Sequence, residues 1–170
     1  MREEYPQPVV LDATVVSNFA STDRISTLVA SVAAPVVVPS VRREIEQGIE
    51  EGHGYLDSAV AAIGETISVQ SVSAIEDHAA IRDQLDDGES QSLVRVIEQG
   101  GTLATDDLAA RRLATDNGVP VTGSVGILVL AVERGHLDVS TADEWLAVWR
   151  DVRGYYAPVA SVSELIDDPS

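Results

Sequence analysis

The chain has 170 residues, with 28 acidic side chains against 11 basic ones and a formal net charge of −17. This length and a hydrophobic content of 45% indicate one folded domain, expected to cover residues 1–170, rather than a disordered chain. There is no cysteine, which excludes disulfides, thiol catalysis and cysteine-ligated zinc.

All the basic residues are arginines, and lysine is absent. An acid-rich, lysine-free composition is typical of proteins from salt-loving microbes, in which carboxylates hold water and cations against molar internal salt. At about 1 M salt the Debye length is only ~3 Å, so the net charge says little about the substrate. An acidic protein that avoids or binds cationic partners is the alternative interpretation.

No segment of the sequence resembles an export signal or a membrane span. There is no uncharged apolar run of about 18 residues or more, and residues 1–8 lack the apolar core of a secretion signal. We therefore expect a cytoplasmic protein without a membrane partner.

The first half of the chain alternates apolar runs with helical patterns. Apolar runs predict strands at residues 8–11, 35–39 and 67–70. Helical patterns predict helices at residues 15–32, 40–63 and 74–85. The first helix is expected to break near residues 21–23, and the second has Gly48, Gly52 and Gly54 as weak points.

The second half continues the same alternation. Strands are predicted at residues 102–104 and 120–122, and helices at residues 88–99, 107–117, 125–134 and 141–152. Gly118 and Gly135 are predicted to end the helices that precede them. Ser124 is expected to cap the apolar helix that follows it. The tail from Tyr155 onward is ambiguous. Alternation of this kind predicts an α/β fold with a mostly parallel sheet covered on both faces.

Acidic residues recur where the predicted strands end and the following helices begin. Asp12, Asp106 and Asp107 follow buried-strand patterns, and Glu44 and Glu89 lie near helix starts. In a parallel sheet these positions share one edge, where ligands bind. Carboxylates that converge there repel one another, and a divalent metal with oxygen ligands relieves that repulsion.

Each acid taken singly also has a structural interpretation. Asp12 suits a helix N-cap, and Asp86 with Glu89 forms the pattern of a capping box. Asp107 lies four residues before Arg111, a spacing typical of an ion pair on a helix surface. These single-residue interpretations do not explain why the acids recur together at one edge of the sheet.

Other catalytic patterns are disfavoured. A dehalogenase-like phosphatase needs a second Asp where this chain has Thr14, and a phosphate-binding loop needs a lysine. Ser17 lacks the surroundings of a hydrolase nucleophile. Three histidines occur without metal-ligand spacing and are expected at the surface or in packing: His53, His78 and His136.

Five segments, taken in order, resemble a PIN-domain nuclease over residues 8–137. They read Val-Val-Leu-Asp-Ala-Thr, Val-Pro-Ser-Val-Arg-Arg-Glu-Ile, Asp-Asp-Gly-Glu-Ser, Leu-Ala-Thr-Asp-Asp and Val-Pro-Val-Thr-Gly-Ser. The resemblance implies a three-layer α/β/α sandwich and a Mg²⁺- or Mn²⁺-dependent nuclease that acts on single-stranded or structured RNA. Many relatives are toxins of toxin–antitoxin pairs, so an antitoxin protein and a second copy of the chain are further candidate partners.

The resemblance also implies roles for individual residues. It places the metal ligands and catalytic acids at Asp12, Glu44, Glu89 and Asp106, with Asp107 as a further candidate ligand. It makes Thr14 and Ser124 nearby polar supports that can also contact substrate. Glu44 or Glu89 could orient the attacking water.

The arginines close to these acids in sequence are candidates for phosphate contacts, because the guanidinium fork suits phosphate. They are Arg42, Arg43, Arg111 and Arg112. Pairing with acids on solvated helix faces is the alternative for each of them. For the whole protein, the alternative to a nuclease is a PIN-like protein-binding module without catalytic activity.

Overall fold

The structure is a computed structural model that describes residues 5–73, 75–155 and 157–166. The first residues of the N-terminal segment (1–4), the expected helix start at Ala74 and the end of the tail (167–170) lie outside the described part.

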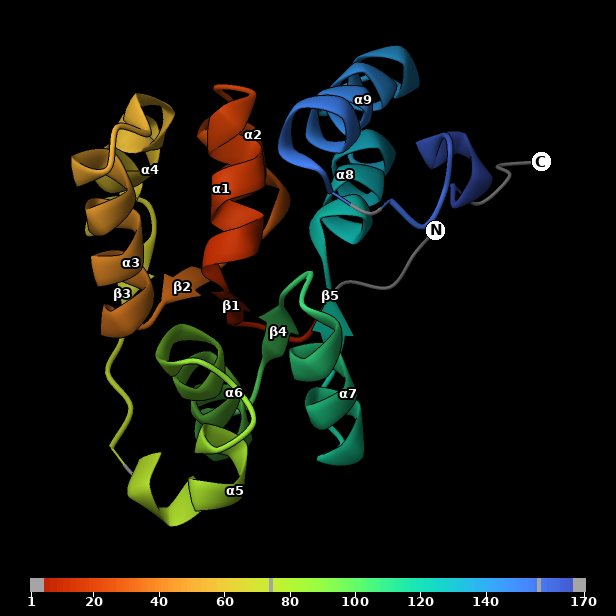
Figure 1. Cartoon of the computed structure of the whole chain (residues 1–170). Coiled ribbons are helices and arrows are strands. Elements are labelled where there is room, and N and C mark those ends of the chain that lie inside the picture. The colour runs from red at the N-terminus through yellow and green to blue at the C-terminus, as the bar shows by residue number, and fades with distance from the viewer. Residues whose placement is uncertain (1–4, 74, 156, 167–170) are drawn as a thin grey trace.

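The centre of the molecule is a five-stranded parallel sheet with the order β3-β2-β1-β4-β5 (Figure 1). Its strands are β1 (Val9–Leu11), β2 (Pro35–Val37), β3 (Ser68–Val69), β4 (Thr102–Ala104) and β5 (Val121–Thr122). Val9 of β1 is in register with Pro35 on one side and with Thr102 on the other. The chain therefore begins in the middle of the sheet, proceeds outward to β3, and returns past β1 to form β4. This reversal creates a switch point between β1 and β4, where α/β proteins bind ligands.

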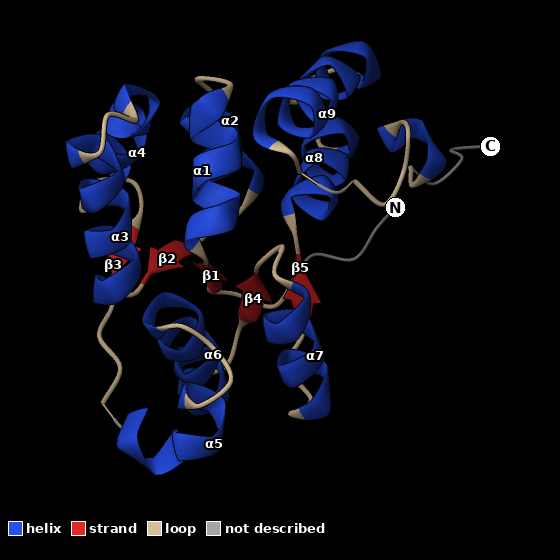
Figure 2. Ribbon diagram, in the orientation of Figure 1, coloured by secondary structure: helices blue, strands red, loops and turns tan. Residues whose placement is uncertain are grey.

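Helices cover both faces of the sheet, which confirms the expected α/β/α sandwich (Figure 2). One side carries α1 (Ala13–Ser21), α2 (Ile25–Ser31), α3 (Pro39–Glu50), α4 (Asp57–Ala62), α8 (Ser124–Glu133) and α9 (Val139–Arg153). The other side carries α5 (Ala79–Arg82), α6 (Asp87–Gln99) and α7 (Leu108–Asp116). Short 3-10 helices occupy Gly54–Leu56, Ile75–His78 and Val162–Glu164.

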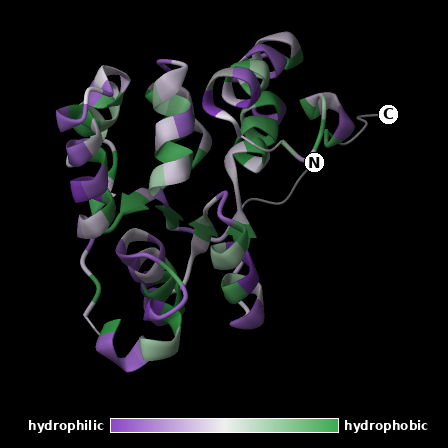
Figure 3. Ribbon diagram, viewed as in Figure 1, coloured by the Kyte–Doolittle hydropathy of each residue, from purple (hydrophilic) through white to green (hydrophobic). Residues whose placement is uncertain are grey.

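The core explains why the apolar runs form these elements. All residues of β1 and β4 are buried, as a strand covered on both faces requires. Apolar residues concentrate on the strands and along α8 (Figure 3). Trp145 and Trp149 of α9 are buried against Phe19, with ring centroids 6.5 and 5.1 Å away, so they pack this helix onto the core.

Two predicted helices are shorter than expected. The helix expected over residues 40–63 ends at Glu50, beside the predicted weak point Gly52, whose backbone has φ +102° and changes the direction of the chain before α4. The helix expected over residues 74–85 is a 3-10 turn followed by the four residues of α5. The break expected near residues 21–23 is confirmed, with Asp23 at φ +56° between α1 and α2.

The cap expected at the start of α8 is also wrong. Gly123 holds the N-cap position without a side-chain hydrogen bond, and Ser124 is the first residue of the helix. The Ser124 N–H donates to Asp106 Oδ1 at 2.8 Å instead. An acid 18 residues upstream thus accepts a hydrogen bond from the first N–H of this helix. Local sequence patterns do not reveal such a contact.

No described helix is long and apolar enough to cross a membrane.

Candidate functional site

The acids that follow β1 and β4 lie at the carboxyl ends of two neighbouring strands. Asp12 follows β1 directly, and Asp106 follows β4 after one intervening residue, Thr105. Glu44 comes from α3 and Glu89 from α6, two helices that contact each other. The switch point of the sheet is therefore the place where the predicted site residues are brought near one another.

Asp12 is a buried carboxylate held entirely by neutral donors. Only 2% of the residue is exposed. Its Oδ1 accepts a hydrogen bond from the Ala13 N–H at 2.8 Å, and its Oδ2 accepts from the hydroxyls of Thr105 at 2.7 Å and Thr14 at 3.2 Å. Burial raises the pKa of Asp12 to about 6, although these hydrogen bonds oppose the rise. Asp12 is also the N-cap of α1, so its structural interpretation is confirmed as well.

Glu44, Asp86 and Glu89 converge with Asp12, and we call these four residues the acidic cluster. A Cβ built on Gly88 would lie 3.6 Å from Glu44 Oε2 and 3.7 Å from Asp86 Oδ1, so these two acids face the same small space. Desolvation raises the pKa of Glu44, and the charges of Asp86 and Asp12 raise it further. Desolvation followed by the charges of Asp86 and Asp12 raises the pKa of Glu89 to about 7.

The capping box expected at the start of α6 is present. The Glu89 N–H donates to Asp86 Oδ1 at 2.8 Å, and the Asp86 N–H donates to Glu89 Oε2 at 3.3 Å. Glu89 is therefore part of a helix cap and of the acidic cluster at the same time.

Asp106 faces the start of α8. Its Oδ2 accepts hydrogen bonds from the Ser124 hydroxyl and from Asn18 Nδ2, the latter at 3.2 Å, and the Tyr155 hydroxyl lies 3.5 Å from its Oδ1. Burial raises the pKa of Asp106, while the bonds from Ser124 and the charge of Arg111 lower it. In this conformation Asp106 serves as a structural acceptor beside the acidic cluster.

Two threonines connect the acids of β1 and β4. The Thr14 hydroxyl donates to Asp12 and accepts from the Asp106 N–H at 3.3 Å. The Thr105 hydroxyl donates to Asp12 and accepts from the Asp107 N–H at 3.2 Å. The two strand ends are therefore tied together by hydroxyl groups that hold the carboxylates in place.

Asp107 is the N-cap of α7, because its Oδ2 accepts from the Ala110 N–H at 2.8 Å. The expected ion pair between Asp107 and Arg111 does not form between these two described side chains. Arg111 Nη1 donates to the Thr105 carbonyl oxygen at 3.0 Å, which places the guanidinium beside Asp106. The charge of Asp107 contributes to the raised pKa of Glu89.

The other candidate arginines make no hydrogen bond with a site acid among the described residues. Arg42 Nε donates to Glu46 Oε1 at 3.0 Å, one helical turn along α3. Arg43 and Arg112 are exposed. The surface-pair alternative is therefore confirmed for Arg42, and Arg111 is the candidate that lies next to a site acid.

Sequence reasoning missed three residues of the site. Asp86 appears in the sequence only as a helix cap, yet it raises the pKa of Asp12, Glu44 and Glu89. Asn18 and Tyr155 contact Asp106 from 88 and 49 residues away in the sequence. The spacing of a capping motif within an acid-rich segment could have indicated Asp86, but no local pattern indicates the other two.

The acidic cluster suits a divalent cation in its donor chemistry. It offers oxygen donors alone, which Mg²⁺ and Mn²⁺ prefer, and its carboxylates raise one another's pKa without a basic side chain among them. Among the described residues, however, no three His, Asp or Glu side chains form a group that could hold a metal ion as they stand. A bound cation would have to draw Glu44 and Glu89 toward Asp12 by side-chain rotation.

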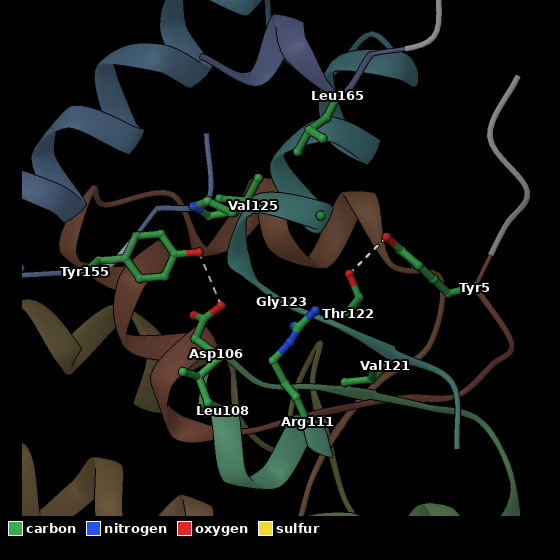
Figure 4. Close-up of a pocket in the computed structure, with 12 residues that line it drawn as sticks. Tyr5, Asp106, Leu108, Arg111, Val121, Thr122, Gly123, Val125, Tyr155 and Leu165 are labelled. Carbon is green, nitrogen blue, oxygen red and sulfur yellow. Dashed lines mark hydrogen bonds between the residues drawn. The ribbon is translucent and has the colours of Figure 1, made fainter. Parts of the chain in front are cut away.

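A cavity of about 540 Å³ opens beside Asp106 (Figure 4). Arg111 and Tyr155 point into it from opposite sides, and the Tyr155 hydroxyl faces the Asp106 carboxylate. The cavity lies along β5 and the start of α8, next to the switch point.

A family model described as a PIN domain matches residues 8–168 of the chain. The searches of curated proteins and of solved structures found no match. The matched segment contains the whole acidic cluster and both acids that follow β4, and it extends past residue 137 through α9.

Proposed function

Because the chain belongs to the PIN-domain family, whose members are generally nucleases, we propose that it is a Mg²⁺- or Mn²⁺-dependent ribonuclease. The reaction would be hydrolysis of phosphodiester bonds in RNA. We further propose that residues 1–170 form a single domain that carries this activity.

The observation that carries the proposal is the uncompensated charge of the acidic cluster. Asp12 is 2% exposed at the end of the central strand, and the charged groups that shift its pKa and those of Glu44 and Glu89 are other acids. A buried carboxylate with an acid nearby and no basic side chain to compensate it costs stability. A site that tolerates this cost is a candidate for binding a cation.

Asp12, Glu44, Glu89 and Asp106 are the proposed metal ligands, with Asp107 as a further candidate. A divalent cation bound there would supply Lewis-acid stabilisation of the phosphate and lower the pKa of water. Asp12 and Asp106 are held by hydroxyl groups at the strand ends, whereas the Glu44 side chain is part of no helix cap.

The remaining side chains would position the substrate and the attacking water. Glu44 or Glu89 can orient the attacking water by accepting a hydrogen bond from it. Arg111 can contact a phosphate oxygen beside Asp106, since guanidinium N–H groups suit phosphate. Thr14 and Ser124 hold Asp12 and Asp106 in the orientations described above, and either hydroxyl can also contact substrate.

The experiment is cleavage of a fluorescently labelled single-stranded RNA by purified protein in high KCl. Wild-type protein should cleave in Mg²⁺ or Mn²⁺ and stop in EDTA. Asp12→Asn should reduce cleavage at least about a hundredfold, because it removes the charge of the central ligand while keeping its size. The matched control Asp151→Asn, on the exposed face of α9, should cleave as wild type does.

This experiment also separates the nuclease from its rival. If wild-type protein and Asp12→Asn show the same cleavage, the activity is a contaminant and the assignment is wrong. A folded protein that never cleaves RNA in either metal would instead be a PIN-like protein-binding module.

We propose that the physiological role is that of a toxin in a toxin–antitoxin pair, acting in the cytoplasm of a salt-adapted microbe. The composition supports the salt adaptation, with a net charge of −17 and no lysine. An antitoxin protein and a second copy of the chain are the proposed protein partners. Expression in a host without the antitoxin should arrest growth for wild type and not for Asp12→Asn; equal growth of the two strains would contradict the toxin role.

A further inference from the structure

The cavity beside Asp106 lies outside the acidic cluster and has a different character. Its volume is about 540 Å³, within the range of pockets that bind small organic ligands. Tyr155, Val125 and Leu108 provide apolar wall, and Asp106 and Arg111 provide the charged part. A site with this composition can accept a flat apolar group that carries a charged substituent.

The apolar wall is accessible from solvent. Leu108, the first residue of α7, is 72% exposed at the cavity although it is a large apolar side chain. The Tyr155 ring is held in place from behind, since its centroid lies 5.9 Å from that of Trp149 with the rings nearly perpendicular. A flat group entering the cavity would therefore meet a fixed aromatic ring and remove Leu108 from water.

The charged part of the cavity has free hydrogen-bonding capacity. Arg111 Nη1 donates to the Thr105 carbonyl oxygen at 3.0 Å, and its other N–H groups have no hydrogen-bond partner among the described residues. Gly123 lets both charged side chains lie close against the backbone. A Cβ at Gly123 would come within 2.6 Å of Asp106 Oδ1 and 2.8 Å of Arg111 Nη1, so any larger residue would clash with them.

We propose that this cavity binds the base of one RNA nucleotide next to the cleaved bond, with Arg111 contacting that nucleotide's phosphate. The proposal rests on the proposed function, because it deepens the substrate assignment of the same site. Asp106 forms part of the cavity and lies one hydroxyl bridge, Thr14, away from Asp12. A base in the cavity therefore sets its phosphate beside the acidic cluster.

The inference restricts the substrate to single-stranded RNA. A base can enter the cavity only after it leaves its stack, which costs free energy in a duplex. Stacking against protein side chains tolerates any base. Arg111 recognises the phosphate, which every nucleotide carries, so the subsite selects unpaired nucleotides rather than a sequence.

The test is binding of adenosine, AMP and inorganic phosphate to the full chain in EDTA, at fixed high KCl, followed by NMR. The backbone amides of Gly123 and Gly126, which line the cavity, are the reporters. Adenosine and AMP should both shift these signals, and AMP should bind more tightly than inorganic phosphate. Leu108→Ser should weaken the binding of adenosine and of AMP about fivefold, because less apolar surface is buried. Arg111→Gln should weaken AMP about tenfold and adenosine less than twofold.

Matched controls lie outside the cavity. Arg112→Gln changes the adjacent exposed arginine, and Val148→Ser changes a partly exposed apolar residue of α9 (37% exposed). Both should bind adenosine and AMP as wild type does. The subsite is wrong if neither adenosine nor AMP shifts the signals of Gly123 and Gly126; a protein partner would then be the alternative occupant to test. The subsite is also wrong if Leu108→Ser and Arg111→Gln bind adenosine and AMP as tightly as their control variants do.

The subsite and the proposed function can fail separately. If the protein cleaves RNA in Mg²⁺ but AMP does not bind in the cavity, the nuclease proposal is supported and the subsite proposal is contradicted. If AMP binds and Leu108→Ser weakens this binding, but the protein never cleaves RNA, the subsite is supported and the nuclease is contradicted.

Discussion

At the scale of single residues, Asp12 shows how one side chain serves both folding and the proposed chemistry. Its Oδ1 caps α1 through the Ala13 N–H at 2.8 Å, and its Oδ2 is held by two threonine hydroxyls. The sequence predicted both roles, because an Asp between a buried strand and a helix suits each. It could not decide between them, and the structure shows that the cap does not exclude the acidic cluster.

The raised pKa values predict how stability depends on pH without metal. Asp12 has a pKa of about 6 in the native protein against 3.8 ordinarily, and Glu89 about 7 against 4.5. Between about pH 4 and 7 the native state therefore binds more protons than the unfolded state, so the free energy of unfolding falls as pH rises. Melting in EDTA at fixed KCl should give a higher Tm at pH 5 than at pH 8.

Asp12→Asn should remove part of that dependence. At pH 8 the amide avoids the cost of a buried charge, so the variant should be more stable than wild type by about 1–3 kcal/mol. The exposed variant Asp151→Asn should follow wild type across the pH range and so corrects for the net charge. A less stable Asp12→Asn protein at pH 8 would mean that the threonine hydrogen bonds outweigh the burial of the charge.

At the scale of elements, some helix ends are determined by neighbouring residues in the sequence and others by distant ones. The box formed by Asp86 and Glu89 and the ends at Gly118 and Gly135 depend on neighbours in the sequence, and they were predicted correctly. The start of α8 depends on Asp106, 18 residues upstream, and it was predicted wrongly. Because local sequence does not reveal the bond from Ser124, Asp106 was predicted as a metal ligand without this structural role.

Asn18 links three helices to Asp106 and was not foreseen. This buried residue of α1 donates to Asp106 Oδ2 at 3.2 Å and to the Ser124 hydroxyl at 3.0 Å. It accepts from Arg153 Nε of α9 at 2.8 Å. An amide is needed here because the site calls for a donor on one side and an acceptor on the other.

Asn18→Ala should therefore destabilise the protein by about 1–3 kcal/mol, since it leaves buried polar groups without partners. Chemical denaturation with urea at fixed KCl measures the change. Ser17→Ala, at the preceding position of α1, is the control and should cost less than about 1 kcal/mol. Equal stability of the two variants would show that the Asn18 bonds contribute nothing.

At the scale of the whole molecule, the alternation of apolar runs and helical patterns was enough to predict a parallel α/β sandwich. The PIN-domain resemblance was confirmed and extends from residue 8 to residue 168. The cavity beside Asp106 could not be predicted from local patterns, because segments far apart in the sequence line it. Tyr155 reaches the cavity from a tail that sequence patterns left ambiguous.

The net charge predicts that the fold requires salt. At about 0.01 M salt the Debye length is ~30 Å, so the acids repel one another across the molecule, whereas at about 1 M it is ~3 Å. The Tm in EDTA should rise by roughly 10 °C between these KCl concentrations, which corresponds to a few kcal/mol. Sucrose at matched osmolarity is the control and should give a smaller rise. An unchanged Tm would contradict the salt adaptation.

The central claim is that Asp12, Glu44, Glu89 and Asp106 act together as a site for a divalent cation. Thermal melting with and without Mn²⁺, at fixed high KCl, tests it most directly because general screening is then saturated. A cation bound only to the native state at a hundredfold excess over Kd adds about 2.7 kcal/mol.

Wild-type protein should therefore melt at a higher temperature in Mn²⁺, and the variant with Asn or Gln at all four positions should lose this rise. A control variant neutralises four exposed acids elsewhere, at Glu50, Glu51, Glu65 and Asp151, and should keep it. If both variants respond to Mn²⁺ alike, the four acids do not form a metal site, and the proposed ribonuclease loses its chemical basis.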